Sequence, residues 1–156
     1  MLRRTLLLVC AAVLTAAAQK YTGPRPPKPD LPYLKHAENL IPTEAADAKE
    51  EKKKDDVLYL IDGANSSAKT PLASPIFLFQ AAKLVPDRLQ LFKLDSRNGR
   101  REILFSSKHP PKAIRIEITR LSSDNLYKIE VDESLEPGEY SLSPEGSNQV
   151  FCFQVF

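Results

Sequence analysis

The segment Ala113-Ile114-Arg115-Ile116-Glu117-Ile118-Thr119 shows the alternation that decides the fold class. Its three isoleucines occupy every second position, and the residues between them are charged or polar. Because successive side chains of a strand point to opposite faces, this pattern predicts a half-buried strand of an antiparallel sheet. We expect it to be a central strand in which Ile116 is buried. Residues 127–132 repeat the alternation.

The rest of the chain after residue 56 has the same strand-like period. Short apolar runs bounded by turn residues predict further strands at residues 57–61, 76–79, 89–94, 103–105, 139–142 and 150–155, preceded by an edge strand at 34–41. Seven or eight short strands without alternating helices predict an all-β sandwich or small barrel. A chain of 156 residues is too short for a large two-domain enzyme. We expect one β domain over residues 33–156.

A tyrosine after a turn sharpens the choice between these all-β architectures. Pro137 and Gly138 form a turn signal, and Tyr140 stands at the start of the strand that follows. This arrangement resembles the tyrosine corner of immunoglobulin-like sandwiches, in which the hydroxyl ties the strand to the preceding crossover. The sequence therefore predicts an immunoglobulin-like (Greek-key) β-sandwich of about seven to eight strands. It is not the antibody type, because the chain contains no tryptophan and no cysteine pair within the domain.

Residues 43–56 are the only helical candidate. Glu44 and Asp47 would lie near the positive end of the helix dipole, and Lys52, Lys53 and Lys54 near its negative end. Ala45, Ala46 and Ala48 are the only apolar residues of the segment. We therefore expect one short charged, solvent-facing helix, or a mobile charged loop, near the N-terminus of the domain.

The N-terminus is typical of an export signal. Arg3 and Arg4 precede an apolar run from Leu6 to Leu14, and small residues follow up to Ala18. We expect residues 1–18 to be a signal peptide, cleavage to leave Gln19 first, and no membrane anchor to remain, because no second apolar run of about 18 residues follows. The expected location is exported, periplasmic or secreted.

Cleavage changes both the charge and the cysteine count. It removes Arg3 and Arg4, so the 22 basic residues fall to 20, equal to the 20 acidic ones. A mature net charge near zero gives no reason to expect nucleic-acid binding. It also removes Cys10 and leaves Cys152 alone, which excludes an intramolecular disulfide and disfavours a cysteine-dense secreted module. Bacterial export is the context that these features favour.

The mature chain begins with a proline-rich leader at residues 19–32. Five prolines between Pro24 and Pro32 fix φ and remove backbone donors, which favours an extended conformation. The leader is interpreted as a solvated tail, with a spacer or a peptide ligand for a partner as the alternative.

The residues that could carry catalysis are few. His36 and His109 are the only histidines, and neither has a second histidine nearby; Glu38, two residues after His36, is the only carboxylate within four residues after either one. Cys152 stands between Phe151 and Phe153, as expected of a core cysteine. We therefore predict no catalytic residue, no metal site and no cofactor.

Charge is distributed unevenly along the chain. Residues 88–120 have an excess of basic side chains, and residues 124–156 have an excess of acidic ones. These opposite charges are interpreted as pairing across neighbouring strands. The alternative is an anion-binding patch centred on Arg97, Arg100 and Arg101, suited to carboxylate, phosphate or an acidic envelope polymer.

The chain as a whole resembles a group of uncharacterised secreted bacterial proteins. The resemblance rests on the leader, on the segment Leu40-Ile41-Pro42-Thr43-Glu44 and on the ending from Pro137-Gly138-Glu139-Tyr140 through Gln149-Val150-Phe151-Cys152-Phe153. It implies export and a β domain, and it assigns no catalytic residue.

Together these features predict an exported, non-catalytic binding or structural module of the bacterial cell envelope. Its partner would be an envelope protein or an acidic polymer. The alternative function is a carbohydrate-active or other hydrolase-like domain that uses loop carboxylates.

Overall fold

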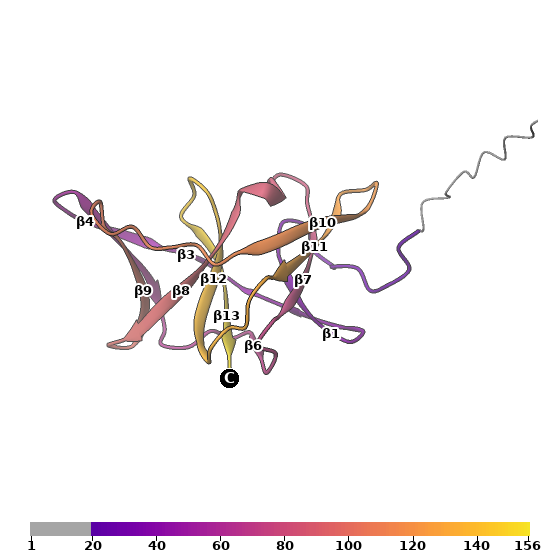
Figure 1. The fold of residues 1–156 in the computed structure, drawn as a ribbon, viewed down its shortest axis with the longest axis horizontal. Coiled ribbons are helices and arrows are strands. Elements are labelled where there is room, and N and C mark those ends of the chain that lie inside the picture. The colour runs from indigo at the N-terminus through magenta and orange to yellow at the C-terminus, as the bar shows by residue number, and fades with distance from the viewer. Residues whose placement is uncertain (1–19) are drawn as a thin grey trace, which may run out of the picture.

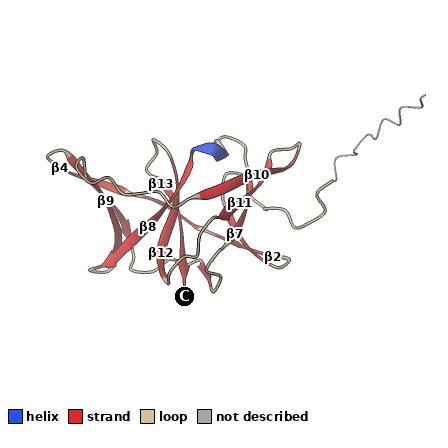
Figure 2. Ribbon diagram, viewed as in Figure 1, coloured by secondary structure: helices blue, strands red, loops and turns tan. Residues whose placement is uncertain are grey.

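The computed structural model describes residues 20–156, so the predicted signal peptide lies outside the described residues. The described chain consists of strands, turns and a single three-residue 3-10 helix, η1 (Pro86–Arg88) (Figure 2). The prediction of an all-β fold is confirmed. No helix in residues 20–156 is long and apolar enough to cross a membrane.

A five-stranded antiparallel sheet forms one layer, on the right of Figure 1. Its strand order is β10-β11-β7-β1-β2. The bounds are β1 (Tyr33–His36), β2 (Asn39–Pro42), β7 (Ile76–Gln80), β10 (Ile116–Ser122) and β11 (Leu126–Val131). The inner strands β11, β7 and β1 carry its most buried residues, including Leu34, Phe77, Phe79 and Ile129.

The second sheet contains eight strands in the order β3-β13-β12-β8-β9-β5-β4, with β6 pairing in parallel with β13. The bounds are β3 (Glu44–Asp47), β4 (Lys49–Lys53), β5 (Asp56–Asp62), β6 (Lys69–Thr70), β8 (Leu89–Arg97), β9 (Arg100–Phe105), β12 (Gly138–Pro144) and β13 (Gln149–Val155). Asn98 and Gly99 both have positive φ, 53° and 73°, as the tight β8–β9 turn requires.

The two ends of this order meet, because β3 and β4 follow each other along the chain with only Ala48 between them. β3 pairs with β13 on one side and β4 pairs with β5 on the other. The backbone N–H of Ala48 donates to the carbonyl of Asn148 at 2.8 Å. The strands β3–β4, β13, β12, β8, β9 and β5 therefore form a closed ring, which we call the ring.

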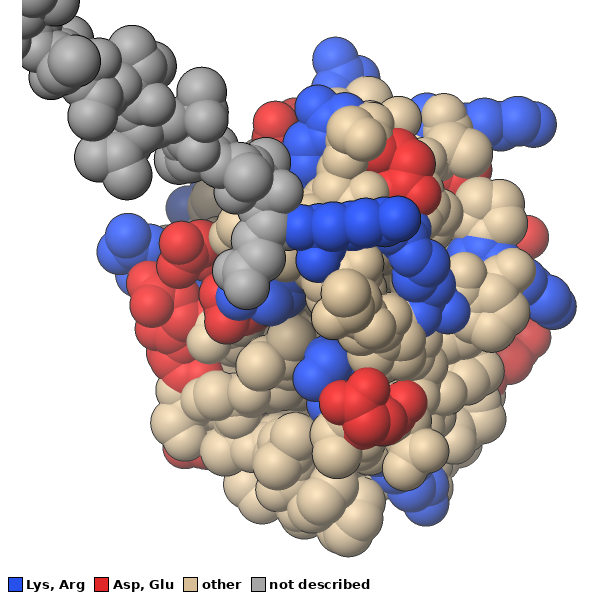
Figure 3. Space-filling view, turned by 90° about the vertical axis from the view of Figure 1, so that its right-hand side faces the viewer, with Lys and Arg blue, Asp and Glu red and all other residues tan. Residues whose placement is uncertain are grey.

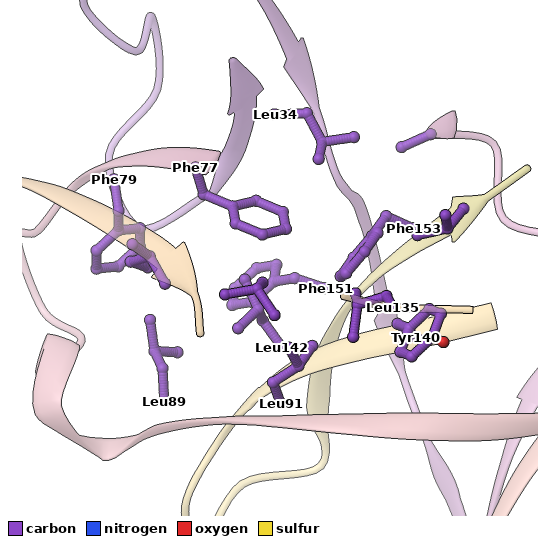
Figure 4. Packing of buried hydrophobic residues seen from close by; sticks show 14 residues of the cluster. Leu34, Phe77, Phe79, Leu89, Leu91, Leu135, Tyr140, Leu142, Phe151 and Phe153 are labelled. Atoms are coloured by element: carbon purple, nitrogen blue, oxygen red, sulfur yellow. The ribbon is translucent and has the colours of Figure 1, made fainter. Parts of the chain in front are cut away.

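The outer face of the ring packs against the five-stranded sheet to form the main core (Figure 4). Phe77 of the five-stranded sheet packs edge-to-face on Phe153 of β13, with ring centroids 5.0 Å apart. Tyr140 stacks on the same phenylalanine at 5.6 Å. Further buried residues of this core are Leu34, Phe79, Leu89, Leu91, Ile129, Leu142 and Phe151. The molecule is thus a sandwich in which one layer is the five-stranded sheet and the other is one wall of the ring.

The hydrogen bond predicted for Tyr140 is present. Its side chain is buried, and the hydroxyl donates to the backbone carbonyl of Glu136 at 2.7 Å, across the turn that precedes β12. The described chain has more strands than the seven or eight predicted, partly because the predicted strand at 34–41 is the hairpin β1–β2. The immunoglobulin-like classification is not confirmed by this arrangement and stays a prediction.

Residues 43–56 are not a helix or a loop but contain β3 and β4, so that prediction is corrected. Their strand pairing comes from β13, about one hundred residues later, and from β5. Local charge spacing carries no information about either partner. The exposed, charged side chains of β4 suit a strand with a free edge.

Residues 113–119 are also corrected, because they do not form a central strand. β10 begins at Ile116 and lies at the edge of the five-stranded sheet, so Ile116 is only half-buried. Ile114 precedes the strand and makes an isolated bridge to Leu91. The alternation identified the strand and its apolar face, but its position in the sheet depends on pairing with β11.

The leader is anchored where it joins the domain. The Asp30 carboxylate accepts hydrogen bonds from the backbone N–H groups of Ala82, Lys83 and Leu84, at 2.9 to 3.0 Å. Burial would raise the pKa of Asp30, but these hydrogen bonds hold it below its usual value. Arg25 forms an ion pair with Asp124 in the β10–β11 turn at 2.7 Å.

Candidate functional site: the cavity inside the ring

Strand register determines which side chains point into the ring. Ser141 pairs with Phe92 on one side and with Cys152 on the other, so these three side chains share the inner face. The same alternation places Tyr59 and Ile61 of β5 with Ile103 and Phe105 of β9. The inner face thus mixes apolar, hydroxyl and charged side chains. The outer face is apolar where β12, β13 and the first half of β8 meet the five-stranded sheet, and it carries ion pairs toward the β8–β9 turn.

A cavity of about 480 Å³ opens inside the ring. Three aromatic side chains form part of its wall. Phe105 of β9 meets Tyr59 and Phe92 edge-to-face, with ring centroids 5.2 Å and 5.4 Å apart. Ile61, Leu94, Ile103 and Val150 complete the apolar lining. This volume lies within the range that ligand pockets of proteins span.

Polar residues also line the cavity. They come from β4, β8, β12 and the β12–β13 turn, and comprise Glu50, Gln90, Ser141, Ser143, Glu145, Ser147 and Asn148. The exposed ones, Glu50, Glu145, Ser147 and Asn148, mark the mouth, whereas Ser141 is buried. The hydroxyls of Ser141 and Ser143 are 3.1 Å apart and share a hydrogen bond. The bond between Ala48 and Asn148 holds the turn against the start of β4, which brings the segment carrying Glu50 close to the turn carrying Glu145.

The opposite end of the ring is closed by a buried ionic cluster around Arg101. Its side chain is 1% exposed. Its guanidinium donates to the carbonyls of Asp62 and Gly63, to Oγ of Ser66 and to the carboxylate of Glu44, the last at 2.6 Å. Each of the three guanidinium nitrogens donates a hydrogen bond, and the carboxylate of Glu44 compensates the positive charge inside the fold.

Two carboxylates complete this cluster. Burial would raise the pKa of Glu44, but hydrogen bonds from Arg101 and from the backbone N–H of Ser67, together with the charge of Arg101, hold it below its usual value. Glu139 accepts hydrogen bonds from the backbone and the hydroxyl of Ser66. The cluster joins β3, β9, β12 and the loop after β5, and therefore fastens the closed end.

Cys152 lies on the inner face and is fully buried, as expected of a core cysteine. Burial raises the pKa of its thiol to about 12, with the carboxylates of Glu44 and Glu139 adding to the rise against the opposing charge of Arg101. The thiol is protonated at neutral pH. It is therefore a packing residue and not an activated nucleophile.

The three arginines predicted to form an anion patch are not gathered on one surface. Arg101 points into the ring, whereas Arg97 and Arg100 pair with Glu102 on the other face of β9, at 2.8 Å and 3.5 Å. Two other basic residues of the segment 88–120 pair with the acidic C-terminal part. Lys93 pairs with Glu136 and Arg115 with Asp132. Figure 3 shows basic and acidic side chains interspersed over the face at the right of Figure 1.

The two histidines lie apart from the cavity. Nε2 of His36 is 2.8 Å from Oγ1 of Thr70, and His109 is exposed in the loop after β9. Neither residue lines the cavity. Within residues 20–156 there is no group of three or more histidine, cysteine, aspartate or glutamate side chains placed to hold a metal ion.

Sequence reasoning missed the cavity. One signal for it was present, because β12 alternates Glu139, Ser141 and Ser143 with Tyr140 and Leu142. A polar face in a strand normally indicates solvent. Here that face looks into the ring, which only the closure through β3–β4 reveals.

No protein-family model, no curated protein and no solved structure matches the chain. The resemblance to secreted bacterial proteins stays a prediction. The function is therefore inferred from the residues of the cavity.

Proposed function

We propose that the mature chain is an exported, non-catalytic binding module that holds a small organic ligand in the cavity of the ring. The observation that carries the proposal is the cavity itself, of about 480 Å³, with an aromatic wall and a polar mouth. Apolar surface supplies affinity in such pockets, and a few polar groups at fixed positions orient the ligand.

The construction of the ring supports a site that exists before the ligand arrives. The closed end is fastened by Arg101 and its partners, and the outer faces of β8, β12 and β13 pack in the main core. A pocket whose walls are rigid in the free protein requires less ordering when it binds.

Export and the absence of catalysis are part of the same proposal. Export is supported by the basic and apolar pattern of residues 1–18. The lack of catalysis is supported by the buried, protonated Cys152 and by the distance of both histidines from the cavity lining. The immunoglobulin-like relationship of the sandwich is a further proposal, supported by the hydrogen bond of Tyr140.

The test is binding of N-phenyl-1-naphthylamine, an uncharged aromatic fluorophore, to the purified mature chain. We expect saturable one-to-one binding. Ser143→Phe places a large side chain in the cavity and should weaken binding at least about tenfold, since the ligand and the new ring compete for the same volume. Ser134→Phe adds the same side chain at an exposed loop position and should leave binding unchanged.

Two results would contradict the proposal. One is binding by Ser143→Phe that equals binding by the unaltered chain, which would place the probe outside the ring. The other is turnover of a glycan, ester or peptide substrate that disappears in Glu50→Gln or Glu145→Gln, which would make the cavity an active site.

A further inference from the structure

We propose that the ligand of the cavity is an organic cation, with an ammonium group at the mouth and an apolar or aromatic body inside. This inference rests on the proposed function and adds the chemical class of the ligand. Its basis is the sign of the charge around the cavity. The lining contains the carboxylates of Glu50 and Glu145 and no lysine, arginine or histidine.

Several acidic groups around the ring are paired with a basic side chain. Asp62 is paired with Lys49, Glu44 with Arg101, and Glu102 with two arginines. Among the described residues, neither Glu50 nor Glu145 forms an ion pair. Two unpaired carboxylates at one opening attract a positive charge and repel an anion.

The basic groups near the mouth form no ion pair with these carboxylates. Lys52 shares the face of β4 that carries Glu50 and lies two residues further along it, but its side chain is not part of the lining. The Lys49 side chain points away from the cavity toward Asp62, with 3.0 Å between Nζ and Oδ2. Arg88 accepts the backbone N–H of Glu145 through its carbonyl, but its side chain is not part of the lining. Arg101 is engaged at the closed end. The negative charge at the mouth is therefore available to a ligand.

The wall favours the same ligand. Tyr59, Phe92 and Phe105 line the cavity, and aromatic faces attract cations through their quadrupole. The serine, glutamine and asparagine side chains of the lining can accept hydrogen bonds from an ammonium group. An anionic ligand would find no positive side chain in this lining.

The experiment compares three probes that share a naphthalene body and differ in charge. They are 2-(1-naphthyl)ethylammonium, 2-(1-naphthyl)ethanol and 1-naphthylacetate, titrated against the mature chain by fluorescence at pH 7 and low salt. We expect the ammonium to bind about tenfold more tightly than the alcohol and the carboxylate to bind most weakly. Raising the salt concentration should reduce the preference for the ammonium, because ions screen exposed charges.

The matched variants separate charge from shape. Glu50→Gln combined with Glu145→Gln should lower the affinity for the ammonium to that of the alcohol and leave the alcohol unchanged. Glu51→Gln is the control, since Glu51 is the neighbour of Glu50 on the outward face of β4 and is exposed. Circular dichroism of each variant confirms the fold, and the salt titration of the unaltered chain tests the charge preference without any substitution.

The outcomes distinguish the two proposals. Equal affinity for all three probes, or tightest binding of the carboxylate, would overturn the cationic ligand and leave the binding cavity standing. A loss of ammonium affinity in Glu51→Gln equal to that in the double variant would overturn the assignment of the charge to the mouth. Failure of every probe to bind would overturn the proposed function itself.

Discussion

The two faces of β12 lie in different surroundings. Tyr140 and Leu142 point outward into the main core, where both are buried. Ser141 and Ser143 point inward and line the cavity. Residues separated by a single peptide bond therefore face a solid apolar core and a hollow interior.

The difference teaches how stability and binding are divided in this fold. The outer face buries phenylalanine and leucine side chains from both layers, which is the arrangement that contributes most to folding. The inner face is held at one end by the ionic cluster of Arg101 and is hollow at the other. The apolar burial on the outer face offsets the packing energy that the unfilled cavity on the inner face lacks.

The largest expected effect is the contrast between two phenylalanines. Phe153→Ala removes a fully buried ring from the main core and should lower the free energy of unfolding by about 3 to 5 kcal/mol. Phe92→Ala should cost roughly 2 kcal/mol, because the space that it leaves joins a cavity that is already open and does not form a closed void. Urea unfolding of both variants measures the contrast. If Phe92→Ala lowered the free energy of unfolding as much as Phe153→Ala or more, the inner face would be packed like the outer one.

The next effect concerns the closed end of the ring and depends on pH. Glu44→Gln should cost about 1 to 3 kcal/mol at pH 7, because Arg101 loses the charge of its carboxylate partner. The folded pKa of Glu44 lies below its ordinary value of 4.5, so its stabilisation is present above pH 4.5 and disappears as the pH falls through the folded pKa. The difference between the unaltered chain and the variant should therefore shrink between about pH 5 and pH 3. Thermal unfolding across that range checks it, and a difference that stays constant would contradict the role of the ion pair.

The sequence was most informative where a pattern is local. The alternation of residues 127–132 predicts a strand that exists as β11, and the turn before Tyr140 predicts a hydrogen bond that is present. In each case the periodicity of the strand or the chemistry of the turn is contained in a few consecutive residues.

The failures concern features that depend on distant pairing. Residues 43–56 carry charges spaced as in a helix, yet β3 pairs with β13, and Glu44 meets Arg101 across 57 positions. Arg97, Arg100 and Arg101 are neighbours in the sequence, but strand alternation sends Arg101 into the ring and its neighbours outward. Apart from the polar alternation of β12, the cavity has no local signature, because its lining comes from six strands and a turn.

The smallest expected effect tests the central claim most directly. Ser143→Phe and Leu142→Phe introduce the same side chain at adjacent residues of β12, and urea unfolding compares their stabilities. Leu142→Phe should cost about 1 to 3 kcal/mol by overpacking the main core, whereas Ser143→Phe should change the free energy of unfolding by less than about 1 kcal/mol because its ring enters an open cavity. If Ser143→Phe lowered the free energy of unfolding as much as Leu142→Phe, the interior of the ring would not be hollow, and the account would be contradicted.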